Sequence, residues 1–219
     1  MRQRELPQPC DAGQSRLPVA DAPVKRVLDL ALASTLIVVL SPLFVAVATV
    51  IALESGWPPL YSQRRTGLDG AEFVMWKFRT MVRNAEALKS QLMELNEAPF
   101  PVFKIRNDPR VTRVGRFLRK SSIDELPQLW NVIRGEMSLV GPRPLPVSEA
   151  AMVLGAGRRR LAARPGITGI WQISNRHCRS ESFDDWVAKD LEYIENWSIW
   201  LDLTLLFKTA RAVLGMTGQ

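Results

Sequence analysis

The sequence predicts a mostly helical α/β domain that follows an N-terminal re-entrant membrane helix, with amphipathic helices lying in the membrane interface. Three observations carry this prediction. Residues 30–53 contain no charge, yet Ser41-Pro42 interrupts the run near its middle. Residues 60–78 have the pattern of two short strands joined by a glycine-rich turn. Beyond residue 183, apolar side chains recur at helical spacing almost to the end of the chain.

The composition favours an anionic partner. The chain has 219 residues, 47% of them apolar, and a formal net charge of +7. That charge suits a membrane surface, a phosphorylated substrate or a nucleic acid, but no nucleic-acid-binding module is recognisable, so no nucleic acid is expected. Cys10 and Cys178 provide neither a disulfide framework nor a Cys-x-x-Cys pair, and the lone His177 argues against a His-rich metal site.

The N-terminal quarter divides into a tail and a membrane segment. Residues 1–23 are polar and proline-rich, which predicts a disordered tail. Residues 24–55 are predicted to form a re-entrant helix-break-helix. Pro42 lacks a backbone donor and crowds the carbonyl of Val38, so the helix should kink or break there, and Ser41 can donate to a freed carbonyl.

The direction of this segment follows from its flanking charges. Basic residues stand on both sides of it, and such residues favour the cytoplasmic side, so both ends are expected on one face of the membrane. Two alternatives remain open: a proline-kinked single span and a buried helix of a soluble protein.

Residues 60–78 are predicted to form a hairpin that turns at residues 67–70. Its basic side chains would make a cationic edge, although a solvated basic strand fits the pattern equally well. These side chains are Arg64, Arg65, Lys77 and Arg79. Residues 82–96 follow as a polar helix to which no chemistry is assigned.

The densest chemistry lies in residues 104–144. A short basic helix, residues 110–119, runs into the adjacent carboxylates Asp124-Glu125, and the stretch closes on the rigid turn Gly141-Pro142-Arg143-Pro144. Cations crowded around two carboxylates suggest a site for an anionic substrate, a phosphate ester with a divalent metal.

Helix capping is the structural alternative for these carboxylates. Ser122-x-x-Glu125 is a capping-box pattern, and Asp124 is a good N-cap that would place Pro127 in the first helical turn. Capping and catalysis are compatible, because the exposed N–H groups at a helix N-terminus keep a carboxylate ionised and fix its orientation.

The C-terminal half is predicted to form helices around one tight turn. Residues 147–164 form a helical run ending in arginines, and residues 164–173 give a Pro-Gly turn into a short apolar run. Residues 183–194 and 197–214 each have one apolar face. Aromatic side chains at one end of the last stretch suit a helix in the membrane interface, and a core-packing helix remains the alternative.

Taken together, these motifs resemble the bacterial sugar transferase family, the monotopic phosphoglycosyl transferases that start polysaccharide and glycoprotein glycan assembly. The likeness covers residues 24–214 and is to the small form, most of all to the exopolysaccharide-initiating galactose- or glucose-phosphate transferases. The matching motifs are KRVLDLALA, the Ser41-Pro42 break, YSQRRTGLDG, WKFRTM, DPRVTRVGRFLRKSSIDELPQLWNVIRGEMSLVGPRP and RPGITGIWQI.

The resemblance implies a reaction and a location. Such enzymes move a sugar-1-phosphate from a UDP-sugar, here UDP-galactose or UDP-glucose, to undecaprenyl phosphate and release UMP, with Mg²⁺ as cofactor. Residues 56–219 would be a catalytic domain on the cytoplasmic face of the bacterial inner membrane. The resemblance also admits a homo-oligomer and downstream glycosyltransferases as partners.

The resemblance also implies roles for individual residues. Asp124 would be the nucleophile that forms a covalent phosphosugar, and Glu125 would be a ligand for Mg²⁺ or would orient the site. Further matched positions are the phosphate-binding Arg119 and Arg143, the basic Lys77 and Arg79 near the site, Arg176 after the PGITG run, Asp190 in the following helix, and the Ser41-Pro42 break. The family usually has Gly-Arg where this chain has Asn175-Arg176.

Two other functions fit parts of the pattern. A basic membrane-anchored scaffold that is not an enzyme would explain the charge but has little use for the carboxylate pair. A membrane-anchored metal-dependent phosphatase or nucleotidyl transferase would use the same carboxylates and cations. The products distinguish these enzymes, because only the sugar transferase releases UMP and leaves a lipid-pyrophosphoryl sugar.

Overall fold

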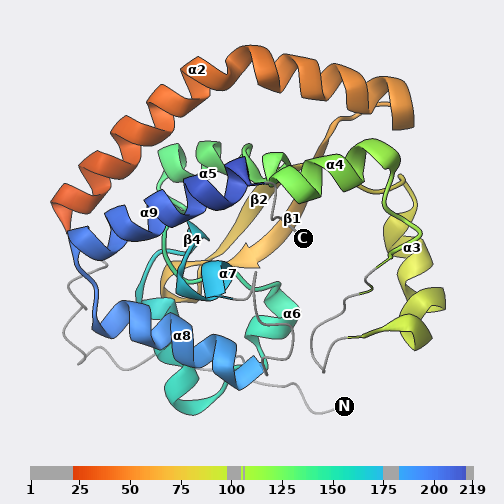
Figure 1. The fold of residues 1–219 in the computed structure, drawn as a ribbon. Helices are drawn as coiled ribbons and strands as arrows, with labels where there is room; N and C mark the ends of the chain where they lie inside the picture. The colour runs from red at the N-terminus through yellow and green to blue at the C-terminus, as the bar shows by residue number, and fades with distance from the viewer. Residues whose placement is uncertain (1–21, 98–104, 106, 175–182, 216–219) are drawn as a thin grey trace.

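The computed structural model describes residues 22–97, 105, 107–174 and 183–215. This part is mostly helical with four short strands, which confirms the mostly helical α/β class (Figure 1). The helices are α2 (Pro23–Ser55), α3 (Ala85–Lys89), α4 (Arg113–Ser121), α5 (Gln128–Arg134), α6 (Val147–Ala150), α7 (Ile170–Ser174), α8 (Phe183–Glu195) and α9 (Ile199–Leu214). The strands are β1 (Leu60–Thr66), β2 (Glu72–Phe78), β3 (Ser138–Val140) and β4 (Gly166–Thr168).

Helix α2 arches over α5, α4 and β3 as one continuous helix (Figure 1). Pro42 lies inside it, so the expected break into two helices is wrong. The Ser41 hydroxyl donates to the Val38 carbonyl over 2.8 Å, as expected for a carbonyl that Pro42 leaves without its usual donor. The helix therefore curves through the proline instead of stopping there.

The inner and outer faces of α2 differ in burial. Ala33, Val47 and Ile51 are buried against the domain, whereas Val38 and Leu53 are exposed. By length and composition α2 could cross a membrane. Only 11% of its most apolar 18-residue stretch is buried within the protein. This exposed apolar face favours membrane association over a helix buried in a soluble protein.

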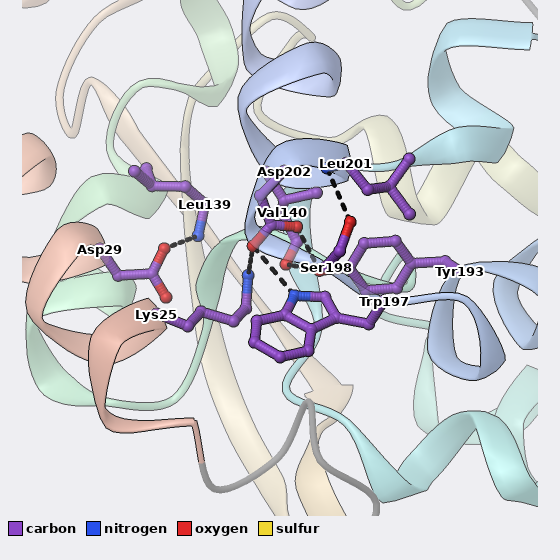
Figure 2. A network of polar contacts seen from close by, with 9 residues as sticks. All are labelled: Lys25, Asp29, Leu139, Val140, Tyr193, Trp197, Ser198, Leu201 and Asp202. Atoms are coloured by element: carbon purple, nitrogen blue, oxygen red, sulfur yellow. Dashed lines mark hydrogen bonds and ion pairs between the residues drawn. The ribbon is translucent and has the colours of Figure 1, made fainter.

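The first turns of α2 are fixed by a buried polar network, shown in Figure 2. Lys25 Nζ lies 2.6 Å from Asp202 Oδ2 in α9, and the Tyr193 hydroxyl donates to Asp202 Oδ1 over 2.7 Å. One turn further along α2, Asp29 accepts a hydrogen bond of 3.0 Å from the backbone N–H of Leu139 in β3. The N-terminal end of α2 is thereby attached to both α9 and β3.

The C-terminal end of α2 is attached to the same domain. Arg79 donates to the carbonyls of Ser55 and Gly56 at the C-terminal end of the helix, where carbonyls lack intrahelical donors. Glu54 accepts from the backbone N–H of Val114 over 3.1 Å. Both ends of α2 therefore contact one and the same folded unit.

Strands β1 and β2 form the antiparallel hairpin that the sequence predicts, with Tyr61 opposite Lys77. The expected common cationic edge is wrong, because its four basic side chains have separate partners. Arg64 is exposed beside Glu72, Arg65 donates to the Pro144 carbonyl, Lys77 reaches Glu125, and Arg79 caps α2.

The outer edge of β2 is occupied by one side chain of α5. Asn131 is fully buried; its Nδ2 donates to the Val74 carbonyl over 2.7 Å, and its Oδ1 accepts from the Trp76 N–H over 3.2 Å. The amide thus makes the two hydrogen bonds that a third strand would make. This contact fixes β2 against α5 just before Lys77.

Strands β3 and β4 form a second, parallel pair, and glycines allow the turn after β3 to lie directly against β4. The Gly141 N–H donates to the Thr168 carbonyl, and the Gly166 N–H donates to the Pro142 carbonyl. A Cβ on Gly166 would lie 2.0 Å from the Gly141 nitrogen, so only glycine allows this approach. The turn that carries Arg143 is thereby attached to the PGITG segment.

Other expected helices are shorter than the sequence suggests. Residues 82–96 contain only α3 and a 3₁₀ helix at Ser90–Leu95, and residues 147–164 contain α6 and a 3₁₀ helix at Gly155–Ala162. In α9, Trp200 and Phe207 are exposed, as expected for an interfacial helix, while Asp202 and Leu205 face the core. The tail predicted for residues 1–23 lies almost wholly outside the described residues.

Candidate functional site

Asp124 and Glu125 lie in a 3₁₀ turn, Ile123–Glu125, between α4 and α5. Ser122 ends α4 in the left-handed conformation, with φ of 57°, and this reverses the chain into the turn. The expected caps are wrong: the Ser122 side chain caps no N–H of this turn, and α5 begins at Gln128 with Pro127 at its N-cap. The carboxylates are therefore not occupied in capping α5.

Glu125 is held between two cations. Lys77 Nζ lies 3.0 Å and Arg143 Nη2 3.5 Å from the same carboxylate oxygen, Oε1. Burial favours the neutral acid, but these two charges outweigh it and hold the pKa of Glu125 well below its usual range. Glu125 is thus an anion at every physiological pH, and its second oxygen, Oε2, takes part in neither ion pair.

Asp124 is the more buried member of the pair. Burial raises its pKa, the charge of Lys77 opposes that rise, and the negative charge of Glu125 adds to it. Arg119 is also close enough to lower the pKa of Asp124. A buried carboxylate that keeps little of its hydration is a stronger nucleophile than one in water.

Arg119 is positioned by the close contact of α4 with the segment after β2. Gly115 in α4 packs on the backbone of Thr80, where a Cβ would lie 2.0 Å from the carbonyl oxygen. One turn later, Arg119 Nε donates to the Thr80 hydroxyl over 3.0 Å. This places the guanidinium on the same cavity wall as Asp124.

A cavity of about 310 Å³ joins the carboxylates to an apolar wall. Its charged lining residues are Asp124, Glu125, Arg119 and Arg143. Much of the remaining lining is formed by apolar side chains of α2, α5, β3, β4 and α9, namely Leu36, Leu129, Leu139, Ile167, Leu206 and Val213. A cavity of this kind suits a molecule with an anionic end and a hydrocarbon end.

Asp190 is not among the residues that line the cavity, but Arg160 connects it to the turn that carries Arg143, which does line it. It is buried in α8 and forms a short ion pair with Arg160, whose Nη2 also donates to the Arg143 carbonyl over 2.7 Å. Burial raises the pKa of Asp190 to about 6, with the charge of Arg160 opposing the rise. The pair thus contacts the backbone of Arg143, in the turn that lines the cavity.

Two other sequence-based assignments differ from the structure or lie outside it. Arg79, expected near the phosphates, instead donates to the carbonyls at the end of α2. Arg176 lies outside the described residues. Arg160 could not be recognised from the sequence, because a run of arginines looks like a solvated surface. Trp171 and Gln172, which line the cavity, were not predicted either.

The carboxylate pair has the donors for a magnesium ion. Mg²⁺ in phosphate-handling sites is commonly held by one or two carboxylates together with the substrate phosphates. Among the described residues no group of three or more His, Cys, Asp or Glu side chains could hold a metal by itself. Any metal held by this pair would complete its coordination with water or with substrate oxygens.

The structure combines an apolar helix long enough to cross a membrane with a cavity lined by carboxylates, arginines and apolar side chains. The pattern of the family described as "Bacterial sugar transferase" matches residues 20–216, and the chain belongs to this family. It is 42% identical over 199 residues to the "UDP-galactose-lipid carrier transferase" of Erwinia amylovora. The aligned region covers 89% of this chain and 41% of that protein.

Two further relatives are similar over more of their own length. The "Exopolysaccharide production protein ExoY" of Sinorhizobium fredii is 43% identical over 86% of this chain and 84% of its own length. The "UDP-glucose:undecaprenyl-phosphate glucose-1-phosphate transferase" of Caulobacter vibrioides is 40% identical over 87% of this chain and 69% of its own length. The chain thus spans less than half of the Erwinia protein but most of these two.

Proposed function

We propose that the protein transfers a sugar-1-phosphate from a UDP-sugar to undecaprenyl phosphate, as the first membrane step of exopolysaccharide or glycan synthesis. The observation that carries the proposal is the cavity that joins Asp124, Glu125, Arg119 and Arg143 to an apolar wall. Both substrates carry phosphate, and one of them carries a long hydrocarbon chain. A single cavity with a cationic end and an apolar wall suits both.

The reaction would proceed in two displacements at Asp124. A carboxylate oxygen of Asp124 attacks the β-phosphorus of the UDP-sugar, and the bond between that phosphorus and the bridging oxygen breaks, so UMP leaves with the electron pair. An oxygen of the lipid phosphate then attacks the same phosphorus and releases Asp124. Arg119 and Arg143 would neutralise the phosphate oxygens while Lys77 holds Glu125 in place.

Glu125 would hold a Mg²⁺ ion. The donors fit, because the Oε2 atom of Glu125 is outside its two ion pairs and the substrate phosphates would complete the coordination. When bound, the ion would screen the negative charge of the diphosphate. The role of this chain's own residues is to keep Glu125 ionised and oriented.

We also propose that α2 is re-entrant and places the site at the cytoplasmic face of the bacterial inner membrane. A helix that crosses a bilayer puts its ends roughly 30 Å apart on opposite faces. Here Lys25 at one end and Glu54 at the other both contact the same domain, which supports entry and exit by one face. The curvature at Pro42 is the feature that would allow it.

The names of the relatives suggest the donor. They refer to UDP-galactose for the Erwinia protein and UDP-glucose for the Caulobacter protein, so one of these two is the proposed donor. A second copy of the chain and downstream glycosyltransferases are proposed partners.

The test is release of UMP from a panel of UDP-sugars, with and without undecaprenyl phosphate and Mg²⁺. The native protein should release UMP from UDP-galactose or UDP-glucose, and Asp124→Asn should release none while staying in the membrane fraction. Asp69→Asn, a matched change at an exposed carboxylate, should keep full activity. Release of free phosphate or pyrophosphate instead of UMP would reject the proposal.

For topology, single cysteines placed near residues 26 and 90 would be labelled from one side of sealed membranes. The re-entrant model requires labelling from the same side. Labelling from opposite sides would show that α2 crosses the bilayer and would overturn it.

A further inference from the structure

Helix α7 contributes two neighbouring side chains to the cavity, Trp171 and Gln172. It contacts both α8 and α9 and lies between them in Figure 1. Trp171 is held in place by stacking on Trp186, with ring centroids 4.2 Å apart and an interplanar angle of 16°. The cavity wall at α7 is thus a fixed surface.

Three polar side-chain atoms of this wall have no hydrogen-bond partner in the described part of the chain. Seven buried side-chain atoms in the described part of the chain lack a hydrogen-bond partner, and three of them are Trp171 Nε1 and the Nε2 and Oε1 atoms of Gln172. A buried amide without partners destabilises a fold, so it is retained only where something else uses it. A cavity ligand would supply the missing partners.

The position of the Gln172 carboxamide depends on a glycine. It packs against Gly169, where a Cβ would lie 2.8 Å from Oε1. The absent side chain at Gly169 leaves space for the amide, whose last torsion varies over a broad range in glutamine. A glycine at position 169 thus accommodates the carboxamide of a residue that lines the cavity.

The chemistry of these groups selects one part of the proposed donor. The phosphates are anionic, and Arg119 and Arg143 in the same cavity already match them. A neutral carboxamide donates and accepts at once, and an indole N–H donates, which suits hydroxyl groups that also do both. We propose that Trp171 and Gln172 form a subsite for the hydroxyl groups of the transferred sugar; this inference rests on the proposed function.

The experiment measures binding, so that it does not depend on turnover. The full chain in lipid nanodiscs carries Asp124→Asn to prevent reaction, and UDP-galactose, UDP-glucose and UMP are titrated by calorimetry. The test variant adds Gln172→Met, which keeps the length of the side chain and removes its hydrogen bonds. The control adds Gln91→Met, the same change at an exposed glutamine.

Gln172→Met should weaken binding of the UDP-sugar about fivefold to tenfold, the loss of one or two neutral hydrogen bonds. UMP, which has no transferred sugar, should bind within about twofold of the parent. The thermal midpoint without ligand should stay level or rise, because an unpartnered amide has been replaced by an apolar group. The Gln91→Met control should change none of these values.

Three results for Gln172→Met would overturn the subsite. Equal losses of affinity for UMP and the UDP-sugar would make Gln172 a nucleotide contact, and unchanged affinity for the UDP-sugar would show that it does not bind the sugar. A lower thermal midpoint would make Gln172 structural. Failure of both UDP-sugars to bind the parent would overturn it as well. UMP release by native protein is measured in parallel. If the native protein releases no UMP while Gln172→Met loses affinity for the UDP-sugar but not for UMP, the proposed reaction is rejected and the subsite is supported.

Discussion

Lys25 and Asp202 lie 177 residues apart in the sequence and form a buried ion pair with a separation of 2.6 Å (Figure 2). Asp202 also accepts from the Tyr193 hydroxyl and from Trp197 Nε1. The contact joins α2, the first described helix, to α9, the last. It follows that the membrane-associated helix and the domain fold as one unit.

Replacing Lys25 should therefore destabilise the whole chain. Lys25→Met leaves a buried carboxylate without its cation, and such changes reduce the free energy of unfolding by about 3 kcal/mol. Chemical unfolding in detergent, followed by tryptophan fluorescence, measures the change. Arg64→Met removes the exposed pair with Glu72 and should cost less than about 1 kcal/mol. Equal losses for the two variants would contradict the buried role of Lys25.

Asp124→Asn should raise the thermal midpoint while it abolishes activity. A carboxyl group whose folded-state pKa is raised stabilises the fold when protonated, and this contribution is lost as the pH rises through that pKa. At pH 8 the neutral amide should therefore be the more stable by about 2–4 °C, and the advantage should shrink at pH 4. Thermal scans across this range measure it, with Asp69→Asn as the exposed control. A constant difference at all pH values would contradict the raised pKa.

The rate of UMP release should depend on the ionisation of Asp124. Because burial raises the pKa of Asp124, the rising limb of the pH–rate profile should lie at a higher pH than the pKa of an ordinary carboxyl group. Glu125 stays ionised throughout this limb. The charge of Lys77 lowers the pKa of Asp124, so Lys77→Met should move this limb to higher pH. Arg64→Met should leave it in place. A limb that moves to lower pH in Lys77→Met would contradict this electrostatic assignment.

Asp190→Asn should act on substrate binding at a distance. It removes the partner of the buried Arg160, which supports the Arg143 carbonyl, so the KM for the UDP-sugar should rise roughly tenfold. Steady-state kinetics measure this, and thermal scans should show lower stability as well. Glu195→Gln removes the neighbouring exposed pair with Arg159 and should change neither value. A loss of stability with an unchanged KM would limit Asp190 to a structural role.

The sequence allowed much of this architecture to be predicted where the signal was local. The glycine turn and the alternation of residues 60–78 predicted the hairpin, and it is present with Lys77 opposite Tyr61. The carboxylates and Arg143 were singled out by charge, and the fold brings them together through Glu125. Such features depend on neighbours in the chain.

The remaining features depend on tertiary contacts that spacing does not encode. Lys77 and Arg79 stand two residues apart in one basic motif, yet one reaches Glu125 and the other caps α2, because the chain leaves the sheet between them. Gln172 carries no sequence signal of its own, and only the cavity identifies it. At Pro42 the proline effect was expected, but packing of α2 on the domain keeps the helix continuous.

The buried amide of Asn131 has a consequence beyond positioning Lys77. A two-stranded hairpin has two open edges, and an open edge invites strands of other molecules to pair with it. Because Asn131 occupies the Val74 carbonyl and the Trp76 N–H, these two groups in the middle of the β2 edge are not available for such pairing. One side chain thus opposes strand pairing between molecules at the point where the hairpin meets the carboxylates.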